Sequence, residues 1–317
     1  YPDALDPARY IRSPALDLIL QAIAHPHIPH FLILDEMNMS HVERYFSDIL
    51  SAMESGEPVA LHSAGAPGAI RDGVPSTIHL PENLFIIGTI NVDETTYMFS
   101  PKVLDRANSI EFRTGAEQLA SFLRDPSTIR PERLAGRGAG FSDAFLVAAT
   151  IPTPLTDPAL SMLREELLLL FRILADHGYE FGLRTAAEAS RFTQGFLLLC
   201  SPENAESKTA IMAAVDAQIY QKLLPKLNGT RGRLEPALRS LASFCETPHV
   251  WSATTPPVLL NADQLLASAR TAAKPRYGGA AVPQAPTGNA PFPLSLDKIE
   301  RMLRALDHNG FASFAEA

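Results

Sequence analysis

The sequence predicts an α/β domain followed by an all-helical domain, and three observations lead to this fold class. Residues 31–34 form an apolar run that ends in two adjacent carboxylates, which is typical of a strand buried on both faces of a parallel sheet. Residues 84–90 form a second apolar run of the same kind, which ends at Asn91. From residue 157 onward, leucine and phenylalanine recur at helical spacing, so the second half of the chain is expected to be helical.

The composition excludes several classes of protein. With 317 residues, 46% of them hydrophobic, the chain can bury a sizeable core, and a net charge of −8 excludes a broadly basic surface for nucleic acid. Two cysteines, Cys200 and Cys245, are too few for a disulfide framework and favour a reducing cytoplasm. No apolar run approaches the roughly 18 residues of a membrane span, and no signal peptide opens the chain, so we expect a cytoplasmic protein with no membrane partner. Because the chain begins with Tyr1 rather than Met, we expect its natural N-terminus to lie upstream.

The residues that end the two apolar runs form a candidate catalytic site. Parallel strands bring their carboxyl ends to one edge of the sheet, where doubly wound folds bind their ligands. Asp35 and Glu36 have the Walker B arrangement, in which the first carboxylate holds the water shell of a nucleotide-bound Mg²⁺ and the second polarises the attacking water. Asn91, at the end of the neighbouring strand, is suited to orienting that water. Alternatively, Asp35 and Glu36 only begin the next helix, where carboxylates suit the helix dipole.

The other elements expected in residues 1–113 fit the second half of an α/β nucleotide-binding core. In chain order they are a helix from Ser13-Pro14 to about Ala24, a helix begun by a capping box of Ser40 and Glu43, two short strands at 59–62 and 77–80, a short helix from Ser100-Pro101 through Ala107, and a small strand at 110–112.

The composition divides the rest of the chain into four parts. Residues 114–156, rich in proline and glycine, are expected to form a connector with limited helix, and residues 157–250 a helical domain. Residues 251–292 are expected to be a linker, and residues 293–317 to hold an amphipathic helix that packs back on the helical domain. The helices expected in the helical domain run from Asp157 to His177, from a capping box of Thr185 and Glu188 to about Cys200, from about Ser207 to Leu224, and from Leu234 to Phe244.

Taken together, these motifs resemble the AAA+ family of nucleoside triphosphatases, and closely its McrB-like branch, the nucleotide-hydrolysing subunits of modification-dependent restriction systems. The resemblance covers roughly residues 10–245. The residues that carry it are LILDEMN at 32–38, VERYF at 42–46, NLFIIGTIN at 83–91, SPKVLDRA at 100–107, YEFGLRT at 179–185 and QKLLPKLNG at 221–229.

The resemblance implies a partial P-loop NTPase core followed by a helical lid domain, and it assigns roles to five residues. Asp35 would bind Mg²⁺ through water, Glu36 would be the catalytic base, and Asn91 would be the sensor that orients the water. Arg106 would be an arginine finger that reaches the nucleotide of a neighbouring protomer, and Arg184 would be the lid arginine that contacts the nucleotide. Alternatively, Arg106 is a plain surface charge, and Arg184 only pairs with Glu180 or Glu188.

At the level of the whole protein, the resemblance implies a cytoplasmic enzyme that hydrolyses GTP or ATP in a homo-oligomeric ring, a hexamer. Its expected partners are an McrC-like nuclease subunit and DNA, the DNA bound indirectly or through a further N-terminal domain. Two other readings stay open: a remodelling ATPase that acts on proteins, as in the related MoxR branch, and a ring scaffold that does not hydrolyse nucleotide.

Two departures from the family pattern affect these expectations. The sensor asparagine begins the sequence NVDET rather than the NTADR of the best-known members, which leaves the choice between GTP and ATP open. The chain also contains no G-x-x-x-x-G-K-[ST] loop, so we expect that loop upstream and no hydrolysis by residues 1–317 alone.

Four basic residues near Asn228, namely Lys222, Lys226, Arg231 and Arg233, either contact DNA or an acidic partner, or form a solvated helix end.

Overall fold

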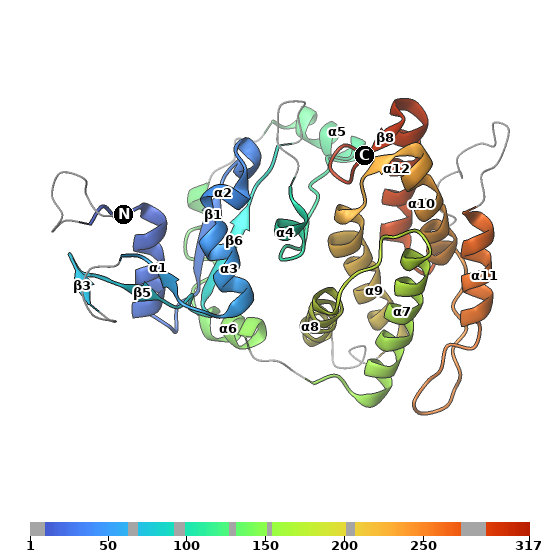
Figure 1. The fold of residues 1–317 in the computed structure, drawn as a ribbon, viewed down its shortest axis with the longest axis horizontal. Helices are drawn as coiled ribbons and strands as arrows, with labels where there is room; N and C mark the ends of the chain where they lie inside the picture. Colours follow the sequence, from blue (N-terminus) through green and yellow to red (C-terminus); the bar gives the residue numbers. More distant parts are fainter. Residues whose placement is uncertain are drawn as a thin grey trace. The chain divides into compact units, whose positions relative to one another are not determined.

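The computed structural model describes residues 10–62, 69–91, 99–126, 131–150, 154–200, 207–273 and 290–317. The chain divides into two compact units (Figure 1). The first, here called the α/β unit, comprises Tyr1–Val103 and Glu111–Ile151. The second, here called the helical unit, comprises Leu104–Ile110 and Pro152–Ala317. The short segment Leu104–Ile110 therefore belongs to the helical unit although its neighbours in sequence belong to the other.

The α/β unit is built around a two-stranded parallel sheet of β1 and β6. Its helices are α1 (Pro14–Ala24), η1 (Met37–Met39), α2 (Val42–Tyr45), α3 (Ser47–Ser55), α4 (Pro101–Leu104, which spans the boundary), α5 (Ala116–Arg124), η2 (Pro131–Leu134) and α6 (Ser142–Thr150). Its strands are β1 (His30–Leu34), β2 (Val59–Ala60), β3 (Ile70–Arg71), β4 (Val74–Pro75), β5 (Thr77–Ile78) and β6 (Leu84–Gly88).

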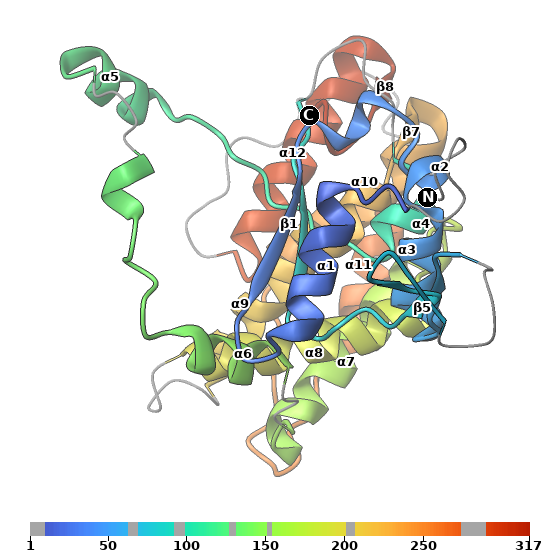
Figure 2. The ribbon, with the colours of Figure 1, turned by 90° about the vertical axis from the view of Figure 1, so that its left-hand side faces the viewer.

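The two central strands pair in parallel from His30 opposite Leu84 to Leu34 opposite Gly88, as the two apolar runs predicted. Alternate side chains of a strand point to opposite faces of the sheet. On one face, Leu32 is buried with Val42 of α2, Leu50 of α3, and Phe46, which lies between these two helices. On the other, Phe31 and Phe85 contact Phe145 of α6. Helix α1 lies beside β1 (Figure 2), and its Ala15 and Leu18 pack on the same face as Leu32.

The helical unit holds the largest apolar core of the described residues. Its helices are α7 (Asp157–Ala175), α8 (Leu183–Leu199), α9 (Lys208–Gln218), the π-helical turn η3 (Ile219–Leu223), η4 (Leu224–Lys226), α10 (Arg231–Glu246), α11 (Ala262–Ala272) and α12 (Pro293–Asn309). Its two short strands, β7 (Gly229–Thr230) and β8 (Phe311–Ala312), pair with each other in antiparallel fashion.

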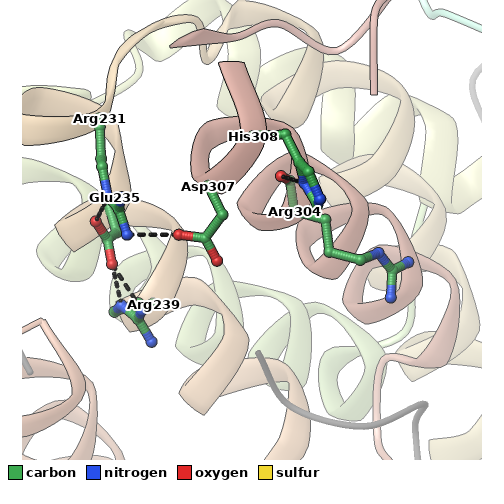
Figure 3. Close-up of polar contacts among 6 residues, drawn as sticks. All are labelled: Arg231, Glu235, Arg239, Arg304, Asp307 and His308. Atoms are coloured by element: carbon green, nitrogen blue, oxygen red, sulfur yellow. Dashed lines mark hydrogen bonds and ion pairs between the residues drawn. The ribbon is translucent and has the colours of Figure 1, made fainter. Parts of the chain in front are cut away.

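Helix α10 lies at the centre of this unit and packs against α7, α11 and α12. Phe244 of α10 stacks on Phe292, the residue that precedes α12, with ring centroids 5.1 Å apart. At the other end of the same helices, Arg231 pairs with Asp307 and thereby joins the start of α10 to the end of α12 (Figure 3). The expectation that the C-terminal helix packs back on the helical domain is confirmed.

The structure corrects several expected elements. Residues 110–112 form no strand, and the side chains of Ile110 and Phe112 are exposed. The short helix that opens at Ser100-Pro101 ends at Leu104 rather than Ala107. The capping boxes expected after Ser40 and at Thr185 do not form, since the residues that cap α2 and α8 are His41 and Gly182. Residues 251–292, expected to be a linker, contain α11, whereas α5 and α6 lie in the connector, where limited helix was expected.

Among the described residues, no helix has the length and apolar character that crossing a membrane requires.

Candidate functional site

The candidate site lies in the α/β unit, at the carboxyl ends of β1 and β6. Because the register of the two strands ends with Leu34 opposite Gly88, the next residues on each strand, Asp35 and Thr89, lie side by side. The backbone N–H of Thr89 donates to the carbonyl of Leu34 at 3.0 Å, and the N–H of Met37 donates to the carbonyl of Thr89 at 2.9 Å. These two bonds continue the ladder past the sheet and fix the turn that carries both carboxylates.

Side-chain hydrogen bonds organise the carboxylates of this turn. The hydroxyl of Thr89 donates to Oδ1 of Asp35 at 2.5 Å and accepts from the backbone N–H of Glu36 at 2.9 Å. The amide Nδ2 of Asn91 donates to Oε1 of Glu36 at 2.9 Å, and Nδ2 of the buried Asn38 donates to the carbonyl of Asn91 at 3.2 Å. The structure thus brings together Asp35, Glu36 and Asn91, the three residues that the sequence placed at this edge.

The backbone at Glu36 is left-handed, with φ of 48° and ψ of 44°. A residue with a Cβ pays roughly 1–2 kcal/mol for this conformation, and such strain gathers at functional sites. A close approach across the site accompanies it, because a Cβ added at Gly88 would lie 1.8 Å from the sulfur of Met37. Gly88 therefore leaves room for the residue that follows the two carboxylates.

The donor atoms at this edge suit a magnesium ion held through water. Mg²⁺ prefers oxygen ligands, keeps several waters, and is commonly bound by one or two carboxylates together with substrate phosphates. Asp35 is exposed and has one carboxylate oxygen beyond the one that Thr89 binds. In the described part of the chain, no group of three or more His, Cys, Asp or Glu residues could hold a metal ion.

Arg106 and Arg184, the two other predicted site residues, belong to the helical unit. Arg106 lies in the segment Leu104–Ile110, and Arg184 lies in the first turn of α8. Burial lowers the pKa of Arg106, the positive charge of Arg184 lowers it further, and the negative charge of Glu188 opposes both. The charges of Arg184 and Glu188 therefore act on Arg106 in opposite directions.

The four basic residues near Asn228 are not a free basic patch. Lys222 is buried and pairs with Glu188, and Lys226 pairs with Asp105. Arg231 pairs with Glu235 and Asp307, and the guanidinium of Arg233 lies 5.7 Å from the ring centre of Tyr179. Each of the four cations thus has an intramolecular partner, which gives no support to the expected contact with DNA or an acidic partner.

Sequence reasoning missed two residues of the site and one ion pair. Thr89 binds both Asp35 and Glu36, and its signal was a hydroxyl directly after the second apolar run. Asn38 holds the backbone of Asn91, and its only signal was an amide that follows the carboxylates by two residues. The sequence makes Glu188 a possible partner of Arg184, whereas no local pattern indicates its ion pair with the buried Lys222.

The comparison with protein families gives one match. The chain belongs to a family described as a domain of unknown function (DUF8727), whose model matches residues 144–311, slightly more than half of the chain. No curated protein and no solved structure matches the chain. The match covers most of the helical unit and ends at Phe311, the first residue of β8.

Proposed function

We propose that this chain is the second half of an AAA+ core with its helical lid, and that the complete protein hydrolyses GTP or ATP. The observation that carries the proposal is the hydrogen bond from Asn91 to Glu36 at the carboxyl ends of two parallel strands. An amide and a carboxylate held side by side at a sheet edge are suited to orienting and activating one water molecule. The hydroxyl of Thr89 donates to Asp35 and so holds this second carboxylate beside the pair of Asn91 and Glu36.

In this mechanism each group of the site has one role. Glu36 takes a proton from the attacking water, whose oxygen forms a bond to the γ-phosphorus while the bond to the β–γ bridging oxygen breaks. Asn91 fixes the position of Glu36 and of the water. Asp35 would hold Mg²⁺ through water, and the ion would neutralise the charge that develops on the phosphate oxygens. The exposure of Asp35, Glu36 and Asn91 leaves them accessible to a nucleotide.

The helical unit contributes positive charge to the same reaction. Arg184 lies in the first turn of a long helix, and Lys226 joins the next residue, Thr185, to Asp105, which directly precedes Arg106. Guanidinium groups stabilise the charge on a transferring phosphoryl group, and in this class they act across a subunit boundary. The proposal therefore includes a homo-oligomeric ring, a hexamer, in which Arg106 serves the nucleotide of a neighbouring copy.

The proposal extends to the partners of the ring. By resemblance to the McrB-like branch, the ring acts with an McrC-like nuclease subunit in the cytoplasm, and it contacts DNA indirectly or through a further N-terminal domain. The net charge of −8 is consistent with indirect contact with DNA, because it excludes a broadly basic surface that would bind DNA directly.

The test is turnover of GTP and of ATP by the complete natural protein in the presence of Mg²⁺. Glu36→Gln and Asn91→Ala should each lower the rate by about 100-fold or more, because each removes a group that acts on the water. Glu43→Gln is the matched control, since Glu43 is a surface carboxylate of α2 in the same unit and should leave the rate unchanged. Wild-type rates in both site variants would contradict the assignment, and the preferred nucleotide would show how near the protein lies to the restriction branch.

A further inference from the structure

The side chain of Lys222 is buried, with 1% of its surface exposed, in a unit whose core is otherwise mostly apolar. Its ammonium group pairs with Glu188 of α8 and donates to the backbone carbonyl of Ala107 at 3.2 Å. A buried ammonium is costly unless it is both paired and hydrogen-bonded, and burial lowers the pKa of Lys222 while Glu188 raises it. An apolar residue would fill this position at lower cost, so the charge at Lys222 calls for a specific role.

The contact of Lys222 with Ala107 is one of three ties that hold the segment Leu104–Ile110 to the rest of the helical unit. Lys226 pairs with Asp105 at 2.5 Å and donates to the hydroxyl of Thr185 at 2.9 Å. The backbone N–H of Ser109 donates to the carbonyl of Gln221 at 2.9 Å. All three ties come from the consecutive turns η3 and η4, and they bind the segment at positions 105, 107 and 109.

The residue inside this tied segment is Arg106. Its immediate neighbours Asp105 and Ala107 are both held, so its backbone is fixed on each side. On α8, Thr185 and Glu188 accept from Lys226 and Lys222, and Arg184 directly precedes Thr185. The same two lysines therefore fix the segment of Arg106 and the first turns of α8, which carry Arg184.

We propose that Lys222 is a positioning residue that anchors the segment of Arg106 beside Arg184, so that the two guanidinium groups bind the same phosphate-bearing ligand. Two like charges held near each other favour an anion with two or more charges, such as the terminal phosphates of a nucleotide. The identity of the ligand rests on the proposed function, whereas the anchoring of the segment does not. The resemblance assigns only Arg106 to the nucleotide of a neighbouring copy. Joint action places Arg184 on that same nucleotide, which is a departure from the resemblance.

The anchor is tested by backbone hydrogen exchange in the complete protein with Lys222→Met. The substitution keeps an apolar stem but removes the ammonium, so exchange in residues 104–110 should accelerate at least tenfold, while amides of α10 and α12 keep their rates. Lys208→Met is the matched control, because Lys208 also donates to a backbone carbonyl of the helical unit, that of His249 at 3.1 Å. Unchanged exchange in residues 104–110 would overturn the proposal.

The joint action of the arginines is tested by kinetics with the same protein. Lys222→Met should lower kcat about as much as Arg106→Ala and leave KM within twofold, and the double variant Arg106→Ala/Arg184→Ala should lose less than the product of the single losses. Faster exchange with a wild-type kcat, or fully multiplicative losses, would overturn the joint role.

Two further measurements test the proposal if Lys222→Met does not fold or if the wild-type protein shows no turnover. If Lys222→Met fails to fold, Glu188→Gln removes the partner charge at a partly exposed position and should accelerate the same exchange to a smaller extent. If the wild-type protein turns over neither nucleotide, the proposed function fails, and binding of inorganic triphosphate decides the arginine pair. Binding that Arg106→Ala and Arg184→Ala each abolish would support the pair, and binding that neither affects would overturn it.

Discussion

Two sets of ionisable side chains, one in each unit, lie in opposite surroundings. In the α/β unit, Asp35 and Glu36 are exposed, and neutral groups of Thr89 and Asn91 bind one oxygen of each. In the helical unit, Glu166 and His249 are buried and bind each other at 2.9 Å. Lys222 is likewise buried against Glu188. The comparison teaches that charge is left accessible at the proposed site, and is buried and paired where it holds two elements of the helical unit together.

A difference in backbone strain accompanies this difference in exposure. Glu36 is held in the left-handed region at the exposed site. In the helical unit, by contrast, Asp216 of α9 accepts from the backbone N–H groups of Leu294 and Ser295 and so satisfies the start of α12. Free N–H groups at the start of a helix need such an acceptor. The strained backbone at Glu36 lowers stability and leaves a carboxylate exposed, whereas the contacts of Asp216 add stability and bury a carboxylate.

The largest effect on stability is expected from His249→Ala. Glu166 would lose its buried partner, and the carbonyl of Phe244, which His249 also binds at 3.1 Å, would lose a donor. Breaking a buried pair by removing one member costs about 3–5 kcal/mol in the free energy of unfolding, measured by denaturant titration. His308→Ala is the control, because His308 is exposed at the end of α12 and should change stability by less than about 0.5 kcal/mol. A similar small effect at both histidines would remove the contrast between the units.

The buried pair also predicts a pH dependence. Burial raises the pKa of Glu166 above its ordinary value of 4.5, against the opposing effects of His249 and Lys208, while Glu165 raises it slightly. A carboxyl that binds its proton more tightly in the folded state stabilises the fold fully below its unfolded pKa. That stabilisation is lost as the pH rises through the folded pKa.

The stability of the wild type relative to Glu166→Gln should therefore fall as the pH rises above 4.5, by at most about 1.4 kcal/mol for each pH unit, until the raised pKa is passed. Chemical denaturation of both proteins over this range measures the difference. A difference that is flat, or that grows with pH, would contradict the direction of the shift.

The central strands and the exposed site could be predicted because their signals are local. Apolar runs that end in polar residues indicate buried parallel strands, and parallel pairing then brings Asp35, Glu36 and Asn91 to one edge without further information. The helices α7 and α12 were predictable for the same reason, since helical spacing of apolar residues is visible within each segment.

The buried polar contacts could not be predicted, because they depend on residues far apart in the chain. Lys222 binds the carbonyl of Ala107, 115 residues away, so its charge suggested a solvated helix end rather than a buried anchor. Residues 110–112 have the composition of a strand, yet they form none and stay exposed. The capping box expected at Thr185 is a similar case, because the hydroxyl of Thr185 accepts a hydrogen bond from the distant Lys226 instead of capping α8.

A smaller loss is expected from Thr89→Val, which keeps the shape of the side chain and removes its hydroxyl. Asp35 loses a donor and the N–H of Glu36 loses an acceptor, and both can turn to water because the site is exposed. We expect a loss of about 1 kcal/mol in the free energy of unfolding, together with weaker binding of nucleotide and Mg²⁺ by the complete protein. Thr77→Val is the control, since Thr77 is an exposed strand residue of the same unit. Equal nucleotide affinity in both variants would show that Thr89 does not orient Asp35.

The smallest effect has the opposite sign, because Glu36→Asn should stabilise the protein. Asparagine tolerates the left-handed region better than glutamate does, so the substitution relieves part of the strain at φ of 48° and should add about 0.5–1 kcal/mol, despite the loss of the bond from Asn91. Glu36→Gln separates strain from charge, because glutamine removes the negative charge but keeps a long side chain in the same conformation, and it should add nothing. Both variants should lose hydrolysis if Glu36 is the base. If Glu36→Gln stabilises the protein as much as Glu36→Asn does, the negative charge of Glu36, and not its strained backbone, is what lowers the stability of the wild type.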